Sequence, residues 1–339
     1  MSSRVSRMVR HALVMMVGTF ASRILGLARE IVTAALFGAS SQLDAFYVAY
    51  TLANLSRQML AEGALSAAFV PVFSQSLVQR GKEKASHLAR QALWILLVAG
   101  TAVVFAGVIL SPFLVKIMAP GFDSVKASLA ISMTQWMFPF LILVSLAALA
   151  MGVLNSLDSF FVPAIAPALS NVVYLLILFF AASRLGIWTL IIAVLAGGVC
   201  QMVLQWVWSA WNGVLLLPEK PNSRDPELRK MMKLFFPYAA GLSLNQINPV
   251  ISRVLGSFLQ DGAISVLNYA GIPVTHRKIA RSFHVFTGKT ADKLDINWSA
   301  AAKIGGTLIF LMGFENLSTI CNNLIENGMN KNAPCAVVM

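Results

Sequence analysis

Charged residues are scarce in this chain. Only 12% of its 339 residues are Asp, Glu, Lys or Arg, while 58% are hydrophobic. A soluble globular domain carries about 25% charged and about 45–50% apolar residues. The mean hydropathy is +0.74. This composition excludes an ordinary soluble domain, because so much apolar surface must face lipid rather than water.

Cysteine and histidine are also rare, and their spacing excludes several kinds of site. No CxxC pair, Cys/His metal spacing or nucleophile–base constellation is present, so the sequence predicts no disulfide framework, metal or cofactor. These residues therefore predict no enzyme active site. The cysteines are Cys200, Cys321 and Cys335, and the histidines are His11, His87, His276 and His284.

Acidic residues are outnumbered, with 14 Asp and Glu against 26 Lys and Arg and a net charge of +12. In a soluble protein this balance would indicate nucleic-acid binding. Here the basic residues gather in short loops between apolar stretches, which is typical of a membrane protein that follows the positive-inside rule. The sequence therefore predicts contact with membrane lipids and no nucleic acid.

Long apolar stretches are abundant, and a transmembrane helix needs about 20 such residues. The sequence predicts an all-α polytopic membrane protein with about seven spans. The first two are long and not purely apolar, which predicts tilt or a local break in each. The ranges are 12–37, 42–73, 88–117, 126–153, 161–183, 186–211 and 234–258.

Loop charges predict the orientation. Alternate loops on one side hold twelve basic residues, whereas the opposite side holds three, so the N-terminus is expected in the cytoplasm. A cleaved signal peptide is the weaker alternative, because the apolar pattern resumes after Arg23 and no convincing small-x-small cleavage site precedes a soluble domain. The first group is Arg4, Arg7, Arg10, Arg80, Lys82, Lys84, Arg90, Lys220, Arg224, Arg229, Lys230 and Lys233, and the second is Lys116, Lys126 and Arg184.

The first two predicted spans contain charged residues that a membrane disfavours. Three arginines facing lipid would cost roughly 8–10 kcal/mol, so they must face protein or a water-filled cavity. Arg23 and Glu30 are seven apart and share a helix face, while Arg29 lies about 120° from Arg23. The charged residues are Arg23, Arg29 and Glu30 in the first span, and Asp44, Arg57 and Glu62 in the second.

Two interpretations of these charges stay open. The arginines can simply pair with Glu30 and Glu62 to neutralise the bundle. Alternatively, three arginines exceed two deep acids and leave a net positive site. Guanidinium groups match phosphate and pyrophosphate oxygens in a bidentate manner. The second interpretation predicts transport of an anionic substrate.

The same residues resemble a known family. The runs Ser22–Glu30, Asp44–Phe46, Asn54–Arg57 and Ala61–Pro71 are similar to motifs of the MurJ/MviN lipid II flippases, a family of the multidrug/oligosaccharidyl-lipid/polysaccharide exporter (MATE-like) superfamily. The similarity covers roughly residues 10–270 in order. Further matching motifs are Ala119-Pro120-Gly121-Phe122, Phe138-Pro139 and Pro163-Ala164-Ile165-Ala166-Pro167.

The resemblance implies a peptidoglycan function in the bacterial cytoplasmic membrane. Members move the undecaprenyl-pyrophosphate-linked precursor lipid II between leaflets by alternating access. The resemblance also implies that Arg23, Arg29 and Arg57 line a cationic cavity, that Asp44 is functionally important and that Glu62 belongs to the same set. This chain departs from the family in two features. Family members have about twice as many spans, and the functional arginine that the resemblance leads us to expect just after Tyr269-Ala270 is missing here.

The sequence changes character at Gly271, which predicts two parts, residues 1–270 and 271–339. Residues 271–339 contain no apolar run long enough to span a membrane and are expected to form a partial α/β unit. Strands are predicted at 306–312 and 336–338, and a helix at 317–327 that ends at Gly328.

The runs 271–277, 306–313 and 324–328 of this tail resemble uroporphyrinogen-III C-methyltransferase. The cofactor loop of that enzyme has no counterpart here, so the tail is not expected to fold stably or to bind S-adenosylmethionine. A methyltransferase fragment and an inactive membrane fragment are the alternatives to a flippase. The sequence makes no prediction of oligomeric state.

Overall fold

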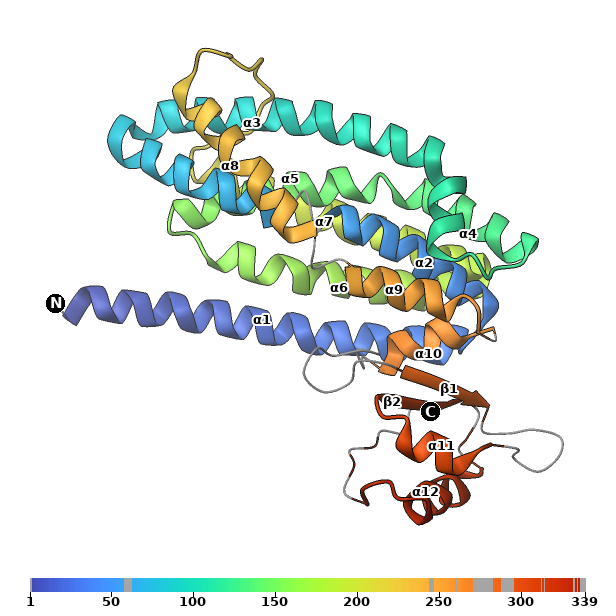
Figure 1. Ribbon diagram of the computed structural model, residues 1–339. Helices are drawn as coiled ribbons and strands as arrows, with labels where there is room; N and C mark the ends of the chain where they lie inside the picture. Colours follow the sequence, from blue (N-terminus) through green and yellow to red (C-terminus); the bar gives the residue numbers. More distant parts are fainter. Residues whose placement is uncertain are drawn as a thin grey trace.

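The computed structural model describes residues 2–57, 63–243, 247–259, 261–270, 283–287, 296–311, 313, 315–331, 333 and 335. Helices α1 to α10 form a helical bundle, and the described C-terminal residues form two strands and two short helices (Figure 1). Glu62 and the predicted strand at 336–338 lie outside the described residues.

The bundle confirms the predicted helical membrane class. Its helices are α1 (Ser2–Phe37), α2 (Ser41–Ser56), α3 (Ser66–Met118), α4 (Ser124–Met137), α5 (Phe140–Ser156), α6 (Phe161–Leu185), α7 (Thr189–Trp211), α8 (Pro226–Ser243), α9 (Ile247–Gly256) and α10 (Ala263–Ala270). A 3-10 turn, Gly186–Trp188, joins α6 to α7.

The predicted spans map onto these helices with several differences: span 126–153 is divided between α4 and α5, and span 234–258 covers parts of α8 and α9. The first span is one unbroken helix of 36 residues, whereas the second is divided between α2 and the start of α3. Among the described residues, three helical stretches are long and apolar enough to cross a membrane, namely Gly63–Met118, Ser124–Ser156 and Phe161–Trp211. The number of seven spans therefore stays a prediction.

Short polar residues and glycines determine where several helices begin and bend. Ser40 accepts the Leu43 N–H at the start of α2, and Asp123 accepts the Lys126 N–H at the start of α4. These bonds satisfy N–H groups that have no partner within the first turn of a helix. Gly81, with a φ of +84°, breaks α3 into two segments, because only glycine adopts this conformation without strain.

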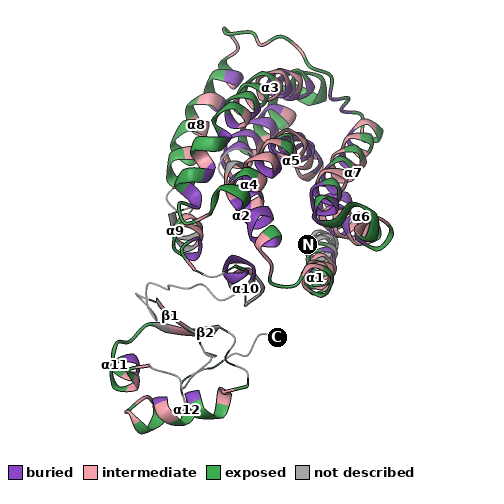
Figure 2. Ribbon diagram, turned by 90° about the vertical axis from the view of Figure 1, so that its right-hand side faces the viewer, coloured by how far each residue is buried: buried purple, intermediate pink, exposed green. Residues whose placement is uncertain are grey.

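Small residues allow α1, α6 and α7 to pack closely. A Cβ at Gly18 of α1 would lie 2.7 Å from the Cβ of Ala164 in α6, and one at Gly197 of α7 would lie 2.6 Å from the Ser170 hydroxyl. Such contacts are typical of membrane helices, which associate through close packing rather than through a hydrophobic effect between them. In the view along the bundle these three helices lie together on one side (Figure 2).

The buried core surrounds α2. Residues 43 to 49 are all buried, and they pack in one cluster with α4, α6 and α7, whereas a second cluster joins α3, α5 and α8. Because α2 is central, any charge on its buried face needs a partner within the bundle. Asp44 is such a charge, with 1% of its surface exposed.

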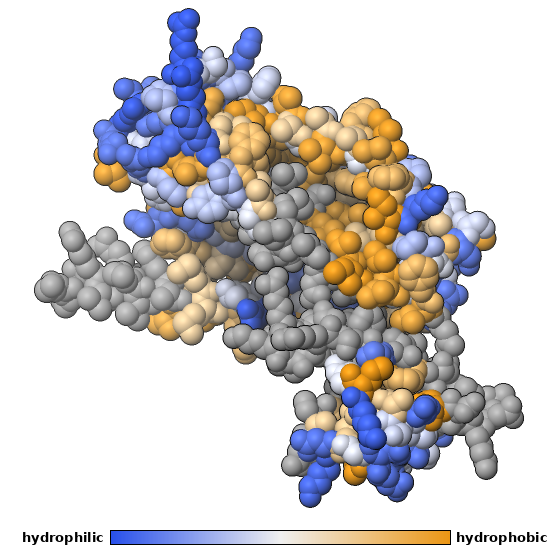
Figure 3. Space-filling model, viewed as in Figure 1, coloured by the Kyte–Doolittle hydropathy of each residue, from blue (hydrophilic) through white to orange (hydrophobic). Residues whose placement is uncertain are grey.

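The outer surface of the bundle is apolar. Phe105 and Ile109 of α3 and Phe179 of α6 are 68%, 69% and 81% exposed. Hydrophilic residues gather instead at the end where α3 bends and α8 begins (Figure 3). Large exposed side chains of this kind indicate a surface that faces lipid tails.

The tail contains a parallel pair of strands, β1 (Phe283–Thr287) and β2 (Thr307–Leu311), in register Phe283↔Thr307 to Thr287↔Leu311. Helices α11 (Trp298–Lys303) and α12 (Leu317–Glu326) accompany them. The predictions for β2 and α12 are confirmed, and Gly328 follows α12 with a φ of +101°. The sequence analysis missed β1 and α11, which are too short to show a clear period.

Candidate functional site

A polar network at one end of the bundle surrounds Glu30 of α1. Its Oε1 accepts a bond from Arg29 at 2.7 Å, and its Oε2 accepts one from the Tyr47 hydroxyl at 3.1 Å. The side-chain amide of Asn268 in α10 also donates to Oε2, at 3.4 Å. One carboxylate therefore joins α1, α2 and α10.

Arg29 is held from a second direction by α6. Its guanidinium carbon lies 5.2 Å from the centre of the Tyr174 ring, and the Tyr174 hydroxyl lies 3.4 Å from the Thr33 hydroxyl. The aromatic face attracts the cation, and this contact is stronger where water is excluded. Of the predicted arginines, Arg29 is the one that the structure places within this network.

Arg253 of α9 enters the same network and was missed in the sequence analysis. Its Nε donates to the Thr51 hydroxyl at 2.9 Å, and one of its terminal nitrogens donates to the Asn268 Oδ1 at 2.8 Å. The guanidinium lies 5.6 Å from the centre of the Tyr47 ring. A signal was present, since Arg253 is a lone charge within the last predicted span, and the cost argument applied to Arg23 applies to it equally.

The other predicted arginines are placed differently. Arg23 is exposed on α1. Glu30 lies about two turns further along the same helix face and pairs with Arg29 instead. Arg57 donates from Nε to the Asn54 side chain at 2.7 Å. The convergence of Arg23, Arg29 and Arg57 in one cavity therefore stays a prediction.

Asp44 lies in a separate buried cluster. Its Oδ2 accepts bonds from the Lys126 ammonium at 2.9 Å and from the Gly262 N–H at 2.7 Å. Its Oδ1 accepts two bonds from Ser265, one from the backbone N–H and one from the hydroxyl. Because Gly262 and Ser265 lie at the N-terminal end of α10, Asp44 caps that helix from α2. The cap anchors the helix that carries Asn268.

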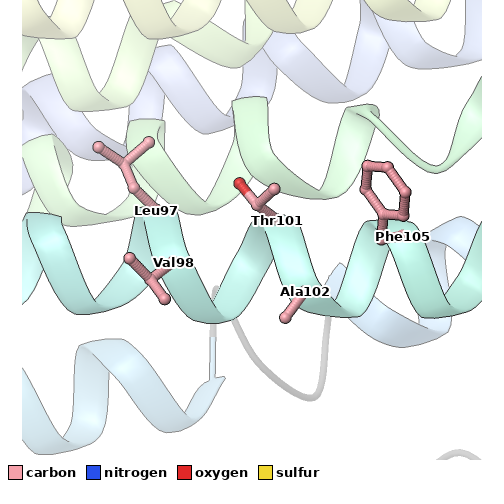
Figure 4. A pocket seen from close by; sticks show the side chains of 5 residues that line it. All are labelled: Leu97, Val98, Thr101, Ala102 and Phe105. Carbon is pink, nitrogen blue, oxygen red and sulfur yellow. The ribbon is translucent and has the colours of Figure 1, made fainter.

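A surface hollow of about 450 Å³ lies away from these charges. It is lined by five residues of α3, of which Thr101 alone is polar (Figure 4), namely Leu97, Val98, Thr101, Ala102 and Phe105. It belongs to the apolar outer surface, with no charged lining residue to bind an anion. The polar network around Glu30 is therefore the candidate site.

The opposite end of the bundle joins two of the basic loops. Arg80 lies 3.2 Å from Glu227, and His87 lies 2.9 Å from Glu219. The Gln91 side chain donates to Asp225 at 3.3 Å. The loop around Gly81 and the linker before α8 therefore lie on the same side, as the predicted orientation requires.

Comparison with known proteins identifies the family. The family profile described as Lipid II flippase MurJ matches residues 33–274. This chain belongs to the MurJ family. The match contains Asp44, Arg57 and Arg253 and ends close to Gly271, where the sequence changes character. The division into two parts stays a prediction.

Curated relatives are about one third identical to this MurJ-family chain over the aligned residues. The lipid II flippase MurJ of Burkholderia cenocepacia is 36% identical over 259 residues, which is 74% of this chain and 50% of that protein. The probable lipid II flippase MurJ of Rhizobium tropici is 35% identical over 260 residues, which is 74% of this chain and 48% of that protein. The chain spans about half the length of the curated relatives it matches.

Solved structures agree on the fold. A structure of lipid II flippase MurJ in an inward closed conformation superposes with a TM-score of 0.64 at 27% identity, covering 76% of this chain and 54% of that chain. A structure of a MATE transporter superposes with a TM-score of 0.60 at 18% identity, covering 73% of this chain and 54% of that chain. The bundle therefore has the MATE-like fold expected from its sequence.

Proposed function

We propose that residues 1–270 form the cationic, substrate-binding lobe of a lipid II flippase. The observation that supports this most directly is the network around Glu30, where one carboxylate lies among two arginines, Arg29 and Arg253. A net positive group within a membrane protein needs an anionic partner. The pyrophosphate of a lipid-linked precursor has the matching charge and geometry.

The predicted site residues contribute in different ways under this proposal. Arg23, Arg29 and Arg57 bind the anionic head group, and Glu62 balances part of their charge. Asp44 positions α10 and does not touch the substrate, because its oxygens accept four bonds from Lys126, Gly262 and Ser265. Exposed Arg23 requires a further polar surface or cavity beside α1, since lipid would not tolerate it.

Transport requires a second lobe under this proposal, because alternating access moves two halves around one site. The relatives named above are about twice as long as the matched segment. The proposed location is the bacterial cytoplasmic membrane with the N-terminus inside, as the loop charges predict. A bound second half, or a second copy of the chain, would complete the cavity.

Binding of a lipid-linked pyrophosphate to the purified full chain tests the proposal without requiring transport. The chain, in lipid nanodiscs, should bind undecaprenyl pyrophosphate more tightly than the uncharged alcohol undecaprenol. Transport is tested separately in a full-length flippase that carries this lobe, using fluorescent lipid II in proteoliposomes. If the wild-type chain shows no preference for the pyrophosphate, the inactive-fragment alternative replaces the flippase proposal.

The tail is proposed to be a partial methylase-like unit without activity. Its described part contains one pair of strands, and its buried apolar cluster consists of Ala301, Ile320 and Leu324. This is a small core for a folded α/β domain. The resemblance to uroporphyrinogen-III C-methyltransferase is thus proposed to reflect shared sequence only, and calorimetry with S-adenosylmethionine tests it.

A further inference from the structure

Arg253 carries a charge that forms no ion pair with an acid in the part of the chain that the structure describes. Its three hydrogen bonds go to the Thr51 hydroxyl, the Ile264 carbonyl and the Asn268 amide oxygen, all of them neutral acceptors. Within the described residues, no carboxylate lies within ion-pair distance of Arg253. Arg29 differs in this respect, because it pairs with Glu30 at 2.7 Å.

Counting contacts with described residues, the Arg253 guanidinium also has N–H groups left to bind a ligand. It has five N–H groups, and the three described bonds use three of them. The bond to Ile264 is long at 3.4 Å. Two further N–H groups in a planar fork are the arrangement that binds a phosphate oxygen pair. Arg253 is partly exposed, and binding of a ligand would require that its two remaining N–H groups face this exposed side.

The surrounding residues fix the direction of Arg253. The Tyr47 ring lies beneath the guanidinium, and Asn268 accepts from Arg253 with its oxygen while donating to Glu30 with its nitrogen. Tyr47 donates to the same Glu30 oxygen. Two cations, Arg29 and Arg253, thus share one hydrogen-bonded network with the Glu30 carboxylate, and this network by itself has one positive charge in excess. The nearby carboxylate of Asp44 also acts on Arg253 and is paired with Lys126.

We infer that Arg253 binds the diphosphate group of the lipid-linked substrate directly, as a cationic group from α9 in addition to the arginines of α1 and α2. The inference rests on the proposed function and adds a residue to it. Asn268 is a positioning residue, since it orients the guanidinium.

The test compares ligands that differ only in head-group charge. The full chain in nanodiscs is titrated with undecaprenyl pyrophosphate, undecaprenyl phosphate and undecaprenol. For Arg253→Gln we expect about a tenfold or larger loss of affinity for the pyrophosphate, a smaller loss for the monophosphate and no change for the alcohol. Arg253→Lys should restore part of the affinity, because an ammonium keeps the charge and loses the fork.

Two controls separate binding from folding. Arg184→Gln removes a positive charge from an exposed position and should leave all three affinities unchanged. Tryptophan fluorescence should show the same thermal midpoint for wild type and Arg253→Lys. An equal loss of affinity for all three ligands in Arg253→Gln would show a structural role and overturn the inference.

Two further comparisons show whether Arg253 binds the pyrophosphate group itself, and whether a negative result contradicts the inference alone or the proposed function as well. Inorganic pyrophosphate should bind wild type more weakly than the lipid does, with a similar fold-loss in Arg253→Gln. An unchanged affinity for inorganic pyrophosphate would overturn direct contact with the anion. If wild type prefers the pyrophosphate and Arg253→Gln keeps that preference, the inference fails alone, whereas a wild type without preference removes the proposed function as well.

Discussion

Asp44 and Ser265 are 221 positions apart in sequence, yet a single carboxylate oxygen of Asp44 accepts both the backbone N–H and the hydroxyl of Ser265, each at 2.7 Å. The bonds connect the buried start of α2 to the first turn of α10. The second oxygen completes the junction through Lys126 and Gly262. This junction positions the helix from which Asn268 reaches the cationic network.

Asp44→Asn should therefore destabilise the bundle. The change leaves the Lys126 ammonium, which is 6% exposed, without one of its two carboxylate partners, and it replaces an acceptor in the helix cap. Removing one partner of a buried ion pair costs about 3–5 kcal/mol, and the remaining bond to Asp261 reduces that to about 2–4 kcal/mol. Thermal unfolding of the purified chain, followed by tryptophan fluorescence, measures the effect.

A matched control for Asp44 is Asp158→Asn. Asp158 is exposed in a turn with a φ of +59°, a conformation that asparagine also adopts readily. Its replacement should change stability by less than about 0.5 kcal/mol. Similar losses for the two variants would mean that the buried junction contributes nothing beyond the general effect of removing a negative charge.

The arginine variants test the predicted cationic site. Arg23→Ala, Arg29→Ala and Arg57→Ala should each weaken undecaprenyl pyrophosphate binding by about 1.5–3 kcal/mol, the range for hydrogen bonds to charged groups. Arg→Lys should rescue only partly, because an ammonium cannot form the bidentate fork. These variants are also measured in a full-length flippase that carries this lobe. If binding and flipping are unchanged in all three alanine variants, the arginines serve only to pair charges within the bundle.

Glu30→Gln should strengthen pyrophosphate binding, whereas the arginine variants should weaken it. The amide keeps an acceptor for Tyr47 but removes the negative charge that now balances Arg29. The site gains one net positive charge, so its affinity for the pyrophosphate should rise by roughly 1 kcal/mol and should fall more steeply with added salt. Titrations at 50 and at 500 mM salt, which differ about threefold in Debye length, check both effects. If Glu30→Gln binds the pyrophosphate more weakly than wild type does at 50 mM salt, this description of Glu30 is wrong.

The predicted orientation is tested by cysteine labelling from outside the cell. With Cys200, Cys321 and Cys335 replaced by serine, Val125→Cys should be labelled by a membrane-impermeant maleimide, and Arg224→Cys should be protected. Both positions are exposed, and Arg224 is preferable to its neighbour Asp225, which bonds Gln91. The reverse pattern of labelling would place the N-terminus outside.

The full chain is expected to show no binding of S-adenosylmethionine by calorimetry. The tail offers one described pair of parallel strands, and its sequence lacks the glycine-rich cofactor loop of the enzyme it resembles. A dissociation constant in the micromolar range would instead support the methyltransferase alternative. A folded tetrapyrrole methylase is the positive control for the assay.

The sequence alone determined the class of the protein and some of its local structure. Apolar runs too long and too uncharged for a soluble domain require a lipid-facing bundle, whatever the arrangement of the helices. Local hydrophobic periodicity and the position of Gly328 also predicted β2, α12 and the end of α12, because these signals depend only on neighbouring residues.

Only the tertiary structure decided which charges meet. Arg23 and Glu30 share a helix face by periodicity, yet Glu30 pairs with Arg29 and receives a bond from Asn268, 238 positions away. Asp44 belongs by sequence with the arginines, and the fold places it with Lys126 and Ser265. Helical periodicity fixes the direction of a side chain around its own axis, whereas its partner depends on which helix packs against that face.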